Sequence, residues 1–294
     1  PDIRAAATAQ DLRALAKSFL TPNNAFLVLA GAIEPEAAEG TIREAFEQWK
    51  SGPDPWAPTR PTLPKPGVTR PTLAALADPD FPKGTASVEM RFRGPDTASP
   101  RSVQAEIWAR LASDPASRIS RAIAKQGATS GGFSEFKAVY RASRALSWLS
   151  ASAIFPLSAK TNPAESAIAF KELVRGTEMY AMKSNPTYFP TKDIEAAKAS
   201  IIEARSSRLV EPREATALLA DEWILGGKSR ILGREASLLS SSNKELAGLA
   251  DEYFMKNLEV LIVRMNAQDM PAKRKALESY GFEILTPEKA FWWL

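Results

Sequence analysis

The chain has 294 residues, of which 45% are apolar and 24% charged, and its formal net charge is +4. This composition is typical of a globular protein of one or two domains, and no apolar run approaches the roughly 18 residues of a membrane-spanning helix. The sequence contains neither cysteine nor histidine, which excludes disulfides, thiolate or imidazole zinc ligands, cysteine nucleophiles and a Ser-His-Asp triad.

The distribution of charge and the lack of cysteine also bear on partners and location. A nucleic-acid-binding protein gathers its cations on one face, whereas Lys and Arg are interspersed here with Asp and Glu. We therefore expect no nucleic-acid partner. Zero cysteine suits an oxidising compartment, and the bacterial periplasm is the expected location.

The first elements predicted along the chain are a helix, a strand and a second helix. Residues 10–20 place apolar side chains on one helical face, and Thr8 with Asp11 resembles a capping box. The run AFLVLAG, residues 25–31, is short and continuously apolar, which predicts a strand buried on both faces. Residues 34–49 return to a helical period. The start of this helix carries Glu34, Glu36 and Glu39. We interpret these glutamates as side chains that the helix dipole stabilises, and not as metal ligands, since no histidine is near.

A change of character follows from Pro53 to Pro82, where nine prolines occur. Proline disfavours both helix interiors and central strands, so residues 53–84 are predicted to form an extended linker without a strand.

The remaining sequence predicts strands and helices in alternation. SVEMRFR alternates apolar and polar residues, and two later runs have similar strand character. Strands are expected at residues 87–93, 133–141 and 145–155, and helices at 101–111, 114–132, 162–183, 193–209 and 211–227. Asp221 and Glu222, in the last of these helices, are interpreted as exposed helix carboxylates rather than as an acid–base pair. The terminal FWWL, residues 291–294, is expected to be covered by this chain or by another, because three aromatic side chains are costly to leave in water.

The opening unit recurs near the end of the chain. A shift of 234 positions aligns residues 8–46 with residues 242–280 without a gap. Thr8 then meets Ser242, and Asn23 meets Asn257. FLVL meets VLIV, residues 260–263. Common descent accounts for the match better than the general pattern of helix, strand and helix, so each copy is interpreted as the closing unit of one domain. The predicted boundaries are 1–52 for the end of a first domain, 53–84 for the linker and 85–294 for a second domain.

These stretches resemble the insulinase, pitrilysin and mitochondrial-processing-peptidase family of inverted-zincin metallopeptidases. The resemblance rests on three stretches: residues 11–46, with their Pro-Asn-Asn before an apolar strand, the run SRISRAI at residues 117–123, and PTKDIEAAKASII at residues 190–202. The resemblance covers nearly the whole chain. It implies two homologous α+β domains that close like a clamshell on a peptide, each with a mixed, mainly antiparallel sheet and helices packed on one face.

The resemblance also implies that catalytic residues and metal ligands are absent here. The family's zinc motif, His-x-x-Glu-His, belongs to the first domain, whereas this chain resembles the non-zinc half. Aligned on Gly127, the substrate-gripping Arg and Tyr of some members fall at Ile123 and Ser130, so both are missing. No cofactor is expected in this chain, and zinc is expected in the missing half or in a partner.

Five residues remain as candidate substrate-binding residues: Arg118, Arg121, Gly131, Gly132 and Phe133. Arg118 and Arg121 share a helix face and could meet a peptide or the partner domain, or form a solvated basic edge. The segment TSGGF, residues 129–133, could line the peptidase chamber or simply end a helix.

The leading hypothesis is a non-catalytic half or subunit of a zinc metallopeptidase, inactive alone, which contributes chamber wall and peptide binding. Its expected partners are a zinc-bearing homologous domain or subunit and a peptide substrate. The alternative is a proteolytically inactive scaffold subunit of a larger assembly, and a third class is a peptide-binding module without a catalytic partner. The sequence leaves the substrate, the identity of the partner and the distinction between fragment and natural subunit open.

Overall fold

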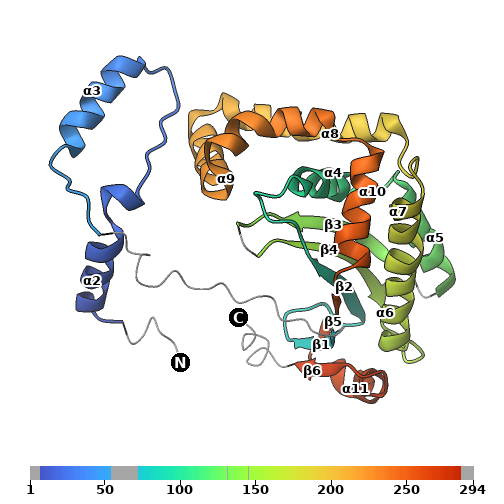
Figure 1. Cartoon of the computed structure of the whole chain (residues 1–294). Helices are drawn as coiled ribbons and strands as arrows, with labels where there is room; N and C mark the ends of the chain where they lie inside the picture. The colour runs from blue at the N-terminus through green and yellow to red at the C-terminus, as the bar shows by residue number, and fades with distance from the viewer. Residues whose placement is uncertain (1–6, 54–71, 131, 145, 286–294) are drawn as a thin grey trace. The chain divides into compact units, whose positions relative to one another are not determined.

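The computed structural model describes residues 7–53, 72–130, 132–144 and 146–285 (Figure 1). The chain divides into two compact units, Pro1–Lys65 with Ser207–Asp221, and Pro66–Ser206 with Glu222–Leu294. The predicted covering of the FWWL terminus falls outside the described residues. Within the described ranges, no helix is both long and apolar enough to cross a membrane.

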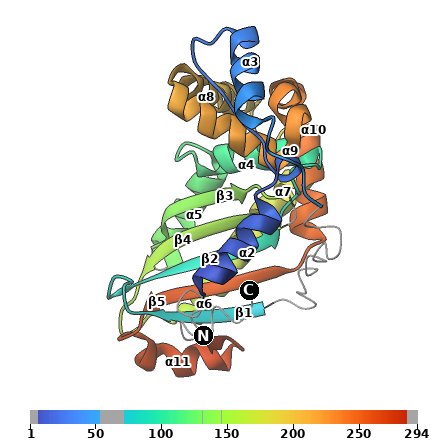
Figure 2. The ribbon, with the colours of Figure 1, turned by 90° about the vertical axis from the view of Figure 1, so that its left-hand side faces the viewer.

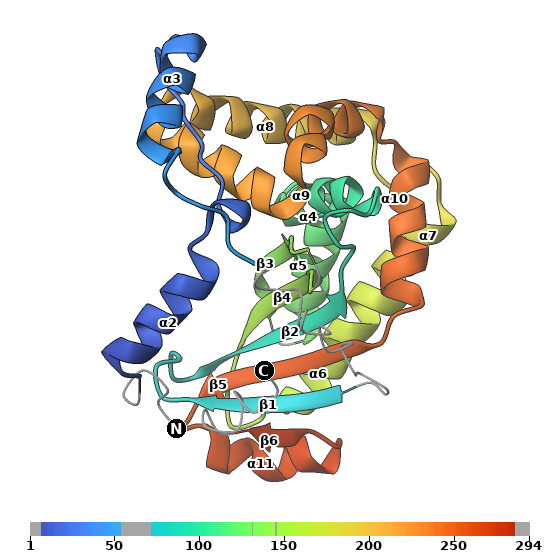
Figure 3. The same cartoon turned by 60° about the vertical axis from the view of Figure 1, so that its left-hand side comes forward.

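A six-stranded mixed sheet forms the centre of the larger unit, in the order β3-β4-β2-β5-β1-β6 (Figure 3). The neighbours from β3 to β5 are antiparallel, whereas β5 with β1 and β1 with β6 are parallel. The predicted α+β class with a mixed, mainly antiparallel sheet is therefore confirmed. The strands are β1 (Thr72–Asp78), β2 (Thr85–Arg93), β3 (Ser134–Arg141), β4 (Trp148–Pro156), β5 (Glu259–Asn266) and β6 (Glu283–Leu285).

Strand β1 corrects the prediction that residues 53–84 contain no strand. Residues 54–71 lie outside the described part of the chain, but Thr72–Asp78 pairs in parallel with β5 from Thr72↔Val260 to Asp78↔Asn266. The sequence of β1, TLAALAD, lies between Pro71 and Pro79 and is rich in alanine, a residue depleted in strands. Pairing with β5 on one side and β6 on the other supplies the stability that the local sequence lacks.

Helices of the larger unit cover one face of the sheet, and α11 lies at its β1–β6 edge (Figure 2). Helix α9 is broken at Gly227, whose φ of +62° suits glycine. The predicted helix over 211–227 thus ends at this glycine, and the continuation to Ser240 was not predicted. The helices of the larger unit are α4 (Arg101–Ser113), α5 (Arg118–Ser130), α6 (Pro163–Lys171), η2 (Glu172–Met179), α7 (Tyr180–Ser184), α10 (Asn243–Leu249), η3 (Ala250–Met255) and α11 (Met270–Ser279). Helices α8 (Thr191–Val210) and α9 (Pro212–Ser240) belong to it except for Ser207–Asp221, which is part of the smaller unit.

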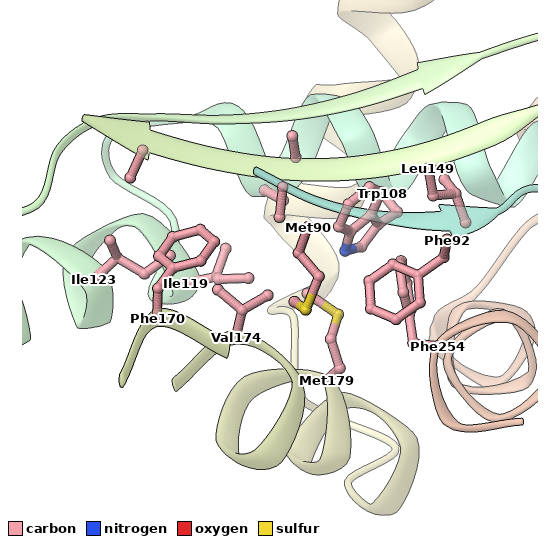
Figure 4. Packing of buried hydrophobic residues seen from close by; sticks show 14 of the residues in the cluster. Met90, Phe92, Trp108, Ile119, Ile123, Leu149, Phe170, Val174, Met179 and Phe254 are labelled. Carbon is pink, nitrogen blue, oxygen red and sulfur yellow. The ribbon is translucent and has the colours of Figure 1, made fainter. Parts of the chain in front are cut away.

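The hydrophobic core lies between the sheet and these helices (Figure 4). Every second residue of β2 points into it, which explains the alternation in SVEMRFR. Trp108 of α4 and Phe92 of β2 both pack on Phe254, with ring centroids 4.8 and 5.1 Å away. The aromatic cluster fixes α4 and η3 to the middle of the sheet.

A buried ion-pair network fixes the start of β5. Glu259 is 1% exposed and pairs with Lys171 at 2.8 Å and with Arg175. Arg175 also donates to the carbonyls of Met255 and Asn257, at 3.1 and 3.3 Å. Burial raises the pKa of Glu259, but the hydrogen bond from Lys171 and the charge of Arg175 outweigh burial, so its pKa lies below the usual value. The network joins η2 to β5, so the strand cannot slide along its neighbours without breaking it.

The β3 edge of the sheet is blocked by a side chain of α4. The Oγ of Ser113 donates to the carbonyl of Ala138 and accepts from its N–H, both at 2.9 Å. These backbone groups would otherwise be available to an added strand, because β3 is an edge strand. Ser113 therefore protects the middle of this edge against pairing with another chain.

The smaller unit contains α2 (Ala9–Phe19), η1 (Pro22–Asn24) and α3 (Pro35–Phe46). Residues 25–30 form no strand, which corrects the prediction of a doubly buried strand. The apolar side chains of this segment and its flanking helices are largely exposed. Exposed positions are Leu12 at 60%, Leu15 at 56%, Leu27 at 56% and Leu29 at 49%.

A comparison of the two copies of the repeat explains why residues 25–30 form no strand whereas the matching residues 259–264 do. Capping boxes form in both, at Thr8 with Asp11 and at Ser242 with Glu245. Among the residues that the structure describes, only the second copy has strands to pair with, since β5 lies between β1 and β2. A strand needs hydrogen-bond partners along its edges, so the first copy stays irregular where the second is a strand.

We predict weak amide protection in the first copy. Amides of Phe26–Leu29 should exchange far faster than those of Val260–Val263, because β5 is hydrogen-bonded along both edges. Hydrogen exchange on a chain verified as monomeric by light scattering measures this. Equal protection of the two segments would show that residues 1–50 fold without a partner.

Replacement of Ser113 by alanine should destabilise the larger unit. Two backbone groups of the half-covered β3 edge would lose their partner, at a cost of about 1–3 kcal/mol. Urea unfolding of Ser113→Ala measures the change. Ser237→Ala is the matched control, since its hydroxyl bonds only within an exposed helix and should change stability by less than about 0.5 kcal/mol.

Candidate functional site

The predicted site residues lie at the two ends of α5. The helix begins after Ser117, whose Oγ accepts from the N–H of Ser120 at 3.1 Å. Arg118 and Arg121 are both exposed in its first turn, as the shared helix face predicts. Their surroundings differ, and so do the roles that the geometry allows them.

Arg118 is engaged with buried groups. Its guanidinium lies over the ring of Tyr188, 4.9 Å from the centroid, and its Nε is 3.7 Å from an oxygen of Glu178. The hydroxyl of Tyr188 donates to the same oxygen at 2.5 Å. Burial raises the pKa of Tyr188, and the hydrogen bond to Glu178 raises it further. Arg118 therefore neutralises a buried carboxylate, which is a structural role.

The segment after α5 contributes to the core. Gly132 has a φ of +84°, which favours glycine at the turn into β3. Phe133 is 5% exposed and packs edge-on against Phe155 and Phe170, at 5.9 and 5.5 Å. Gly131 lies outside the described residues. A peptide contact by these three residues stays a prediction, and the ring of Phe133 faces the core in this chain.

Arg121 lines a cavity of about 700 Å³ between the end of α4, the start of α5 and the first turns of α8. Phe189 is buried at its wall. Arg110 and Lys192 also reach the cavity, and Arg110 donates to Ser200 Oγ at 2.5 Å. Within the described part of the chain, neither Arg121 nor Lys192 forms an ion pair.

The face of the sheet opposite the helices carries polar and aromatic side chains. Trp148 is 38% exposed there. Arg91 lies 5.9 Å from the centre of its ring and is held by Glu89 through two hydrogen bonds of 2.7 and 3.0 Å. A Cβ at Gly94 would lie 3.0 Å from the Trp148 carbonyl carbon, so glycine permits this close approach. Arg141 of β3 lies directly opposite Trp148 of β4 in the sheet.

Carboxylates in the predicted helices do not offer acid–base chemistry. Glu222 is 3% exposed rather than exposed as predicted, and Arg205 holds it by two hydrogen bonds of 2.9 Å. Arg234 bridges Glu222 and Glu106. Both carboxylates of this cluster, Glu106 and Glu222, have a guanidinium partner, so the cluster joins α4, α8 and α9 by ion pairs.

The residues of this chain do not fit a zinc ion. The sequence provides no imidazole or thiolate donor. Among the residues that the structure describes, no three carboxylates come together in a group that could hold a metal. No catalytic step through a metal can be derived for these side chains.

Sequence reasoning missed the cavity cations Arg110 and Lys192 and the exposed Trp148. Arg110 and Lys192 are about 80 positions apart in the sequence, and no spacing predicts their common cavity. The alternation in β4 could have identified Trp148, because it lies out of phase with the buried Leu149 and Ala151.

Comparison with known proteins identifies a family. A family model described as the peptidase M16 inactive domain matches residues 6–201. No curated protein sequence matches the chain.

Several solved structures share the fold. A protease from Helicobacter pylori is 15% identical with a TM-score of 0.66, over 88% of this chain and 59% of that chain. A peptidase M16 inactive domain from Pseudomonas fluorescens is 12% identical with a TM-score of 0.61, over 88% and 57%. The inactive peptidase domain of a candidate zinc protease from Bordetella parapertussis is 15% identical with a TM-score of 0.50, over 61% and 91%. The chain thus spans 59% of the length of the first of these structures.

The two arginines of α5 should behave differently when each is replaced by glutamine. Arg118→Gln removes the cation beside buried Glu178 and should destabilise the protein by about 1 kcal/mol. Arg121→Gln should change stability by less than about 0.5 kcal/mol, because Arg121 is exposed and forms no ion pair with any described residue. Urea unfolding followed by circular dichroism compares them. Equal losses would assign both residues the same role.

Proposed function

Because the chain belongs to the M16 peptidase family through its inactive domain, we propose that it is the non-catalytic half or subunit of a zinc metallopeptidase. In this role it completes a chamber around a peptide and binds the peptide, while a homologous half carries the zinc. The single observation that carries the proposal is the first copy of the repeat, whose helix leucines are exposed where their counterparts in the second copy are buried.

The first copy supports a homologous partner. Leu246 and Leu249 are buried to 1% and 0%, whereas their counterparts Leu12 and Leu15 are 60% and 56% exposed. Each leucine that becomes buried contributes about 1.5–3 kcal/mol. In the second copy, β5 is hydrogen-bonded between β1 and β2. Residues 25–30 of the first copy would need two neighbouring strands of the same kind. A sheet of the same fold is therefore the partner that fits this unit.

The open face of the sheet supports a role as chamber wall. An antiparallel sheet commonly leaves one face in contact with water, and here that face carries the stacked pair Arg91 and Trp148. Tryptophan and arginine are enriched at binding surfaces because they offer apolar area together with hydrogen-bond donors. The helices on the opposite face keep this surface rigid.

The donor set supports an inactive half. With no histidine or cysteine in the sequence, the chain lacks the nitrogen and sulfur ligands that zinc prefers in proteins. Zinc and the water that it activates would therefore come from the partner half.

The proposal predicts that the isolated chain binds no zinc and cleaves no peptide. Elemental analysis after dialysis, together with a fluorogenic peptide assay, measures both properties, with a zinc-loaded peptidase treated in parallel as positive control. Affinity capture should recover a zinc-bearing homologous half, and mixing the two should give cleavage. Stoichiometric zinc with peptidase activity in the chain alone would overturn the proposal, and capture of a respiratory assembly would favour the scaffold alternative.

A further inference from the structure

The cavity beside Arg121 has a lining that suits an anion. Three basic side chains reach it from three helices: Arg110 from α4, Arg121 from α5 and Lys192 from α8. The only hydrogen bond recorded for their charged groups among the described residues joins Arg110 to Ser200 Oγ, a neutral partner. Cations that converge without carboxylate partners leave a positive potential in the cavity.

Two carboxylates also line the cavity, and both have local roles. Asp114 accepts from the N–H of Ala116 at 2.8 Å and so shapes the turn between α4 and α5. Asp193 lies in the acidic first turn of α8, where the helix dipole favours it. Three cations against two carboxylates leave one positive charge in excess, and the exposed Arg121 and Lys192 remain available to a ligand.

Most of the remaining lining is apolar, with Ser113, Ser117 and Ser200 as its polar residues. Leu111, Phe189, Pro190 and Ala197 contribute to it. Its volume of about 700 Å³ lies within the range of roughly 300–1,000 Å³ that organic ligands occupy. A compact anion would leave most of this volume empty, whereas several residues of a peptide would fill it.

We propose that this cavity binds an acidic segment of a polypeptide, with Arg121 and Lys192 as the residues that select carboxylate side chains. The inference goes beyond the proposed function, because the cavity lies among α4, α5 and α8 and not on the open face of the sheet. An acidic segment presents its carboxylates to the cations and its aliphatic stems to the exposed Pro190.

Fluorescence anisotropy on the intact chain tests the proposal. The probe is a fluorescein-labelled peptide with four glutamates between Gly-Ser spacers, and the control peptide has glutamine at the same positions. The glutamate peptide should bind more tightly, and its affinity should fall as salt rises, because screening is strong beyond about 10 Å at 0.1 M salt.

Variants identify the site. Arg121→Gln with Lys192→Gln should weaken binding by about 3-fold to 10-fold, the change expected for the loss of two exposed ion pairs. Lys275→Gln on α11, also an exposed lysine, is the matched control and should leave affinity unchanged. Arg121→Glu with Lys192→Glu should reverse the preference toward a lysine peptide of the same length, a result that a purely structural role would not give.

Three outcomes would overturn the inference: equal binding of the two peptides, equal losses in the cavity and Lys275 variants, or displacement by inorganic phosphate beyond that by sodium chloride of equal ionic strength. The last would assign the cavity to a free anion. Reconstituted cleavage with a zinc-bearing half would still stand in each case, so failure here is distinguishable from failure of the proposed function.

Discussion

An apolar segment forms a strand only where hydrogen-bond partners are available along its edges, and this requirement governs the whole chain. β5 meets it between β1 and β2, and its start is fixed by the ion pairs of Glu259 with Lys171 and Arg175. Residues 25–30 carry the same kind of sequence but have no neighbouring strand in the described part of the chain, and they form no strand themselves. The difference between an ordered domain and an exposed unit therefore lies in available edges rather than in composition.

Local signals in the sequence predicted local structure well. The capping boxes at Thr8 and Ser242 involve side chains three positions away from their partners, so spacing alone reveals them. The alternation in β2 predicted which of its residues are buried. β1 was missed because its alanines carry little strand preference and its stability comes from a partner about 190 positions away.

The candidate site shows the same division between local and distant information. Helical spacing placed Arg118 and Arg121 on one face, but only the fold brings Tyr188 and Glu178 to Arg118 and Lys192 to the cavity of Arg121. Phe133 looked like part of a flexible glycine loop, whereas its ring packs on Phe155 and Phe170. Roles that depend on partners far along the chain could not be assigned from spacing.

The parallel pairing of β1 with β5 has a consequence for synthesis on the ribosome. At about 5–20 residues per second, the roughly 190 positions between Thr72 and Val260 take roughly 10–40 s to translate. The antiparallel strands β2, β4 and β3 emerge well before that and can pair among themselves. β1 must wait for β5 and then β6 with neither edge paired, and β2 waits for β5 with one edge unpaired. The nascent chain therefore spends this interval as a partial sheet, the state in which chaperones and misfolding compete for it.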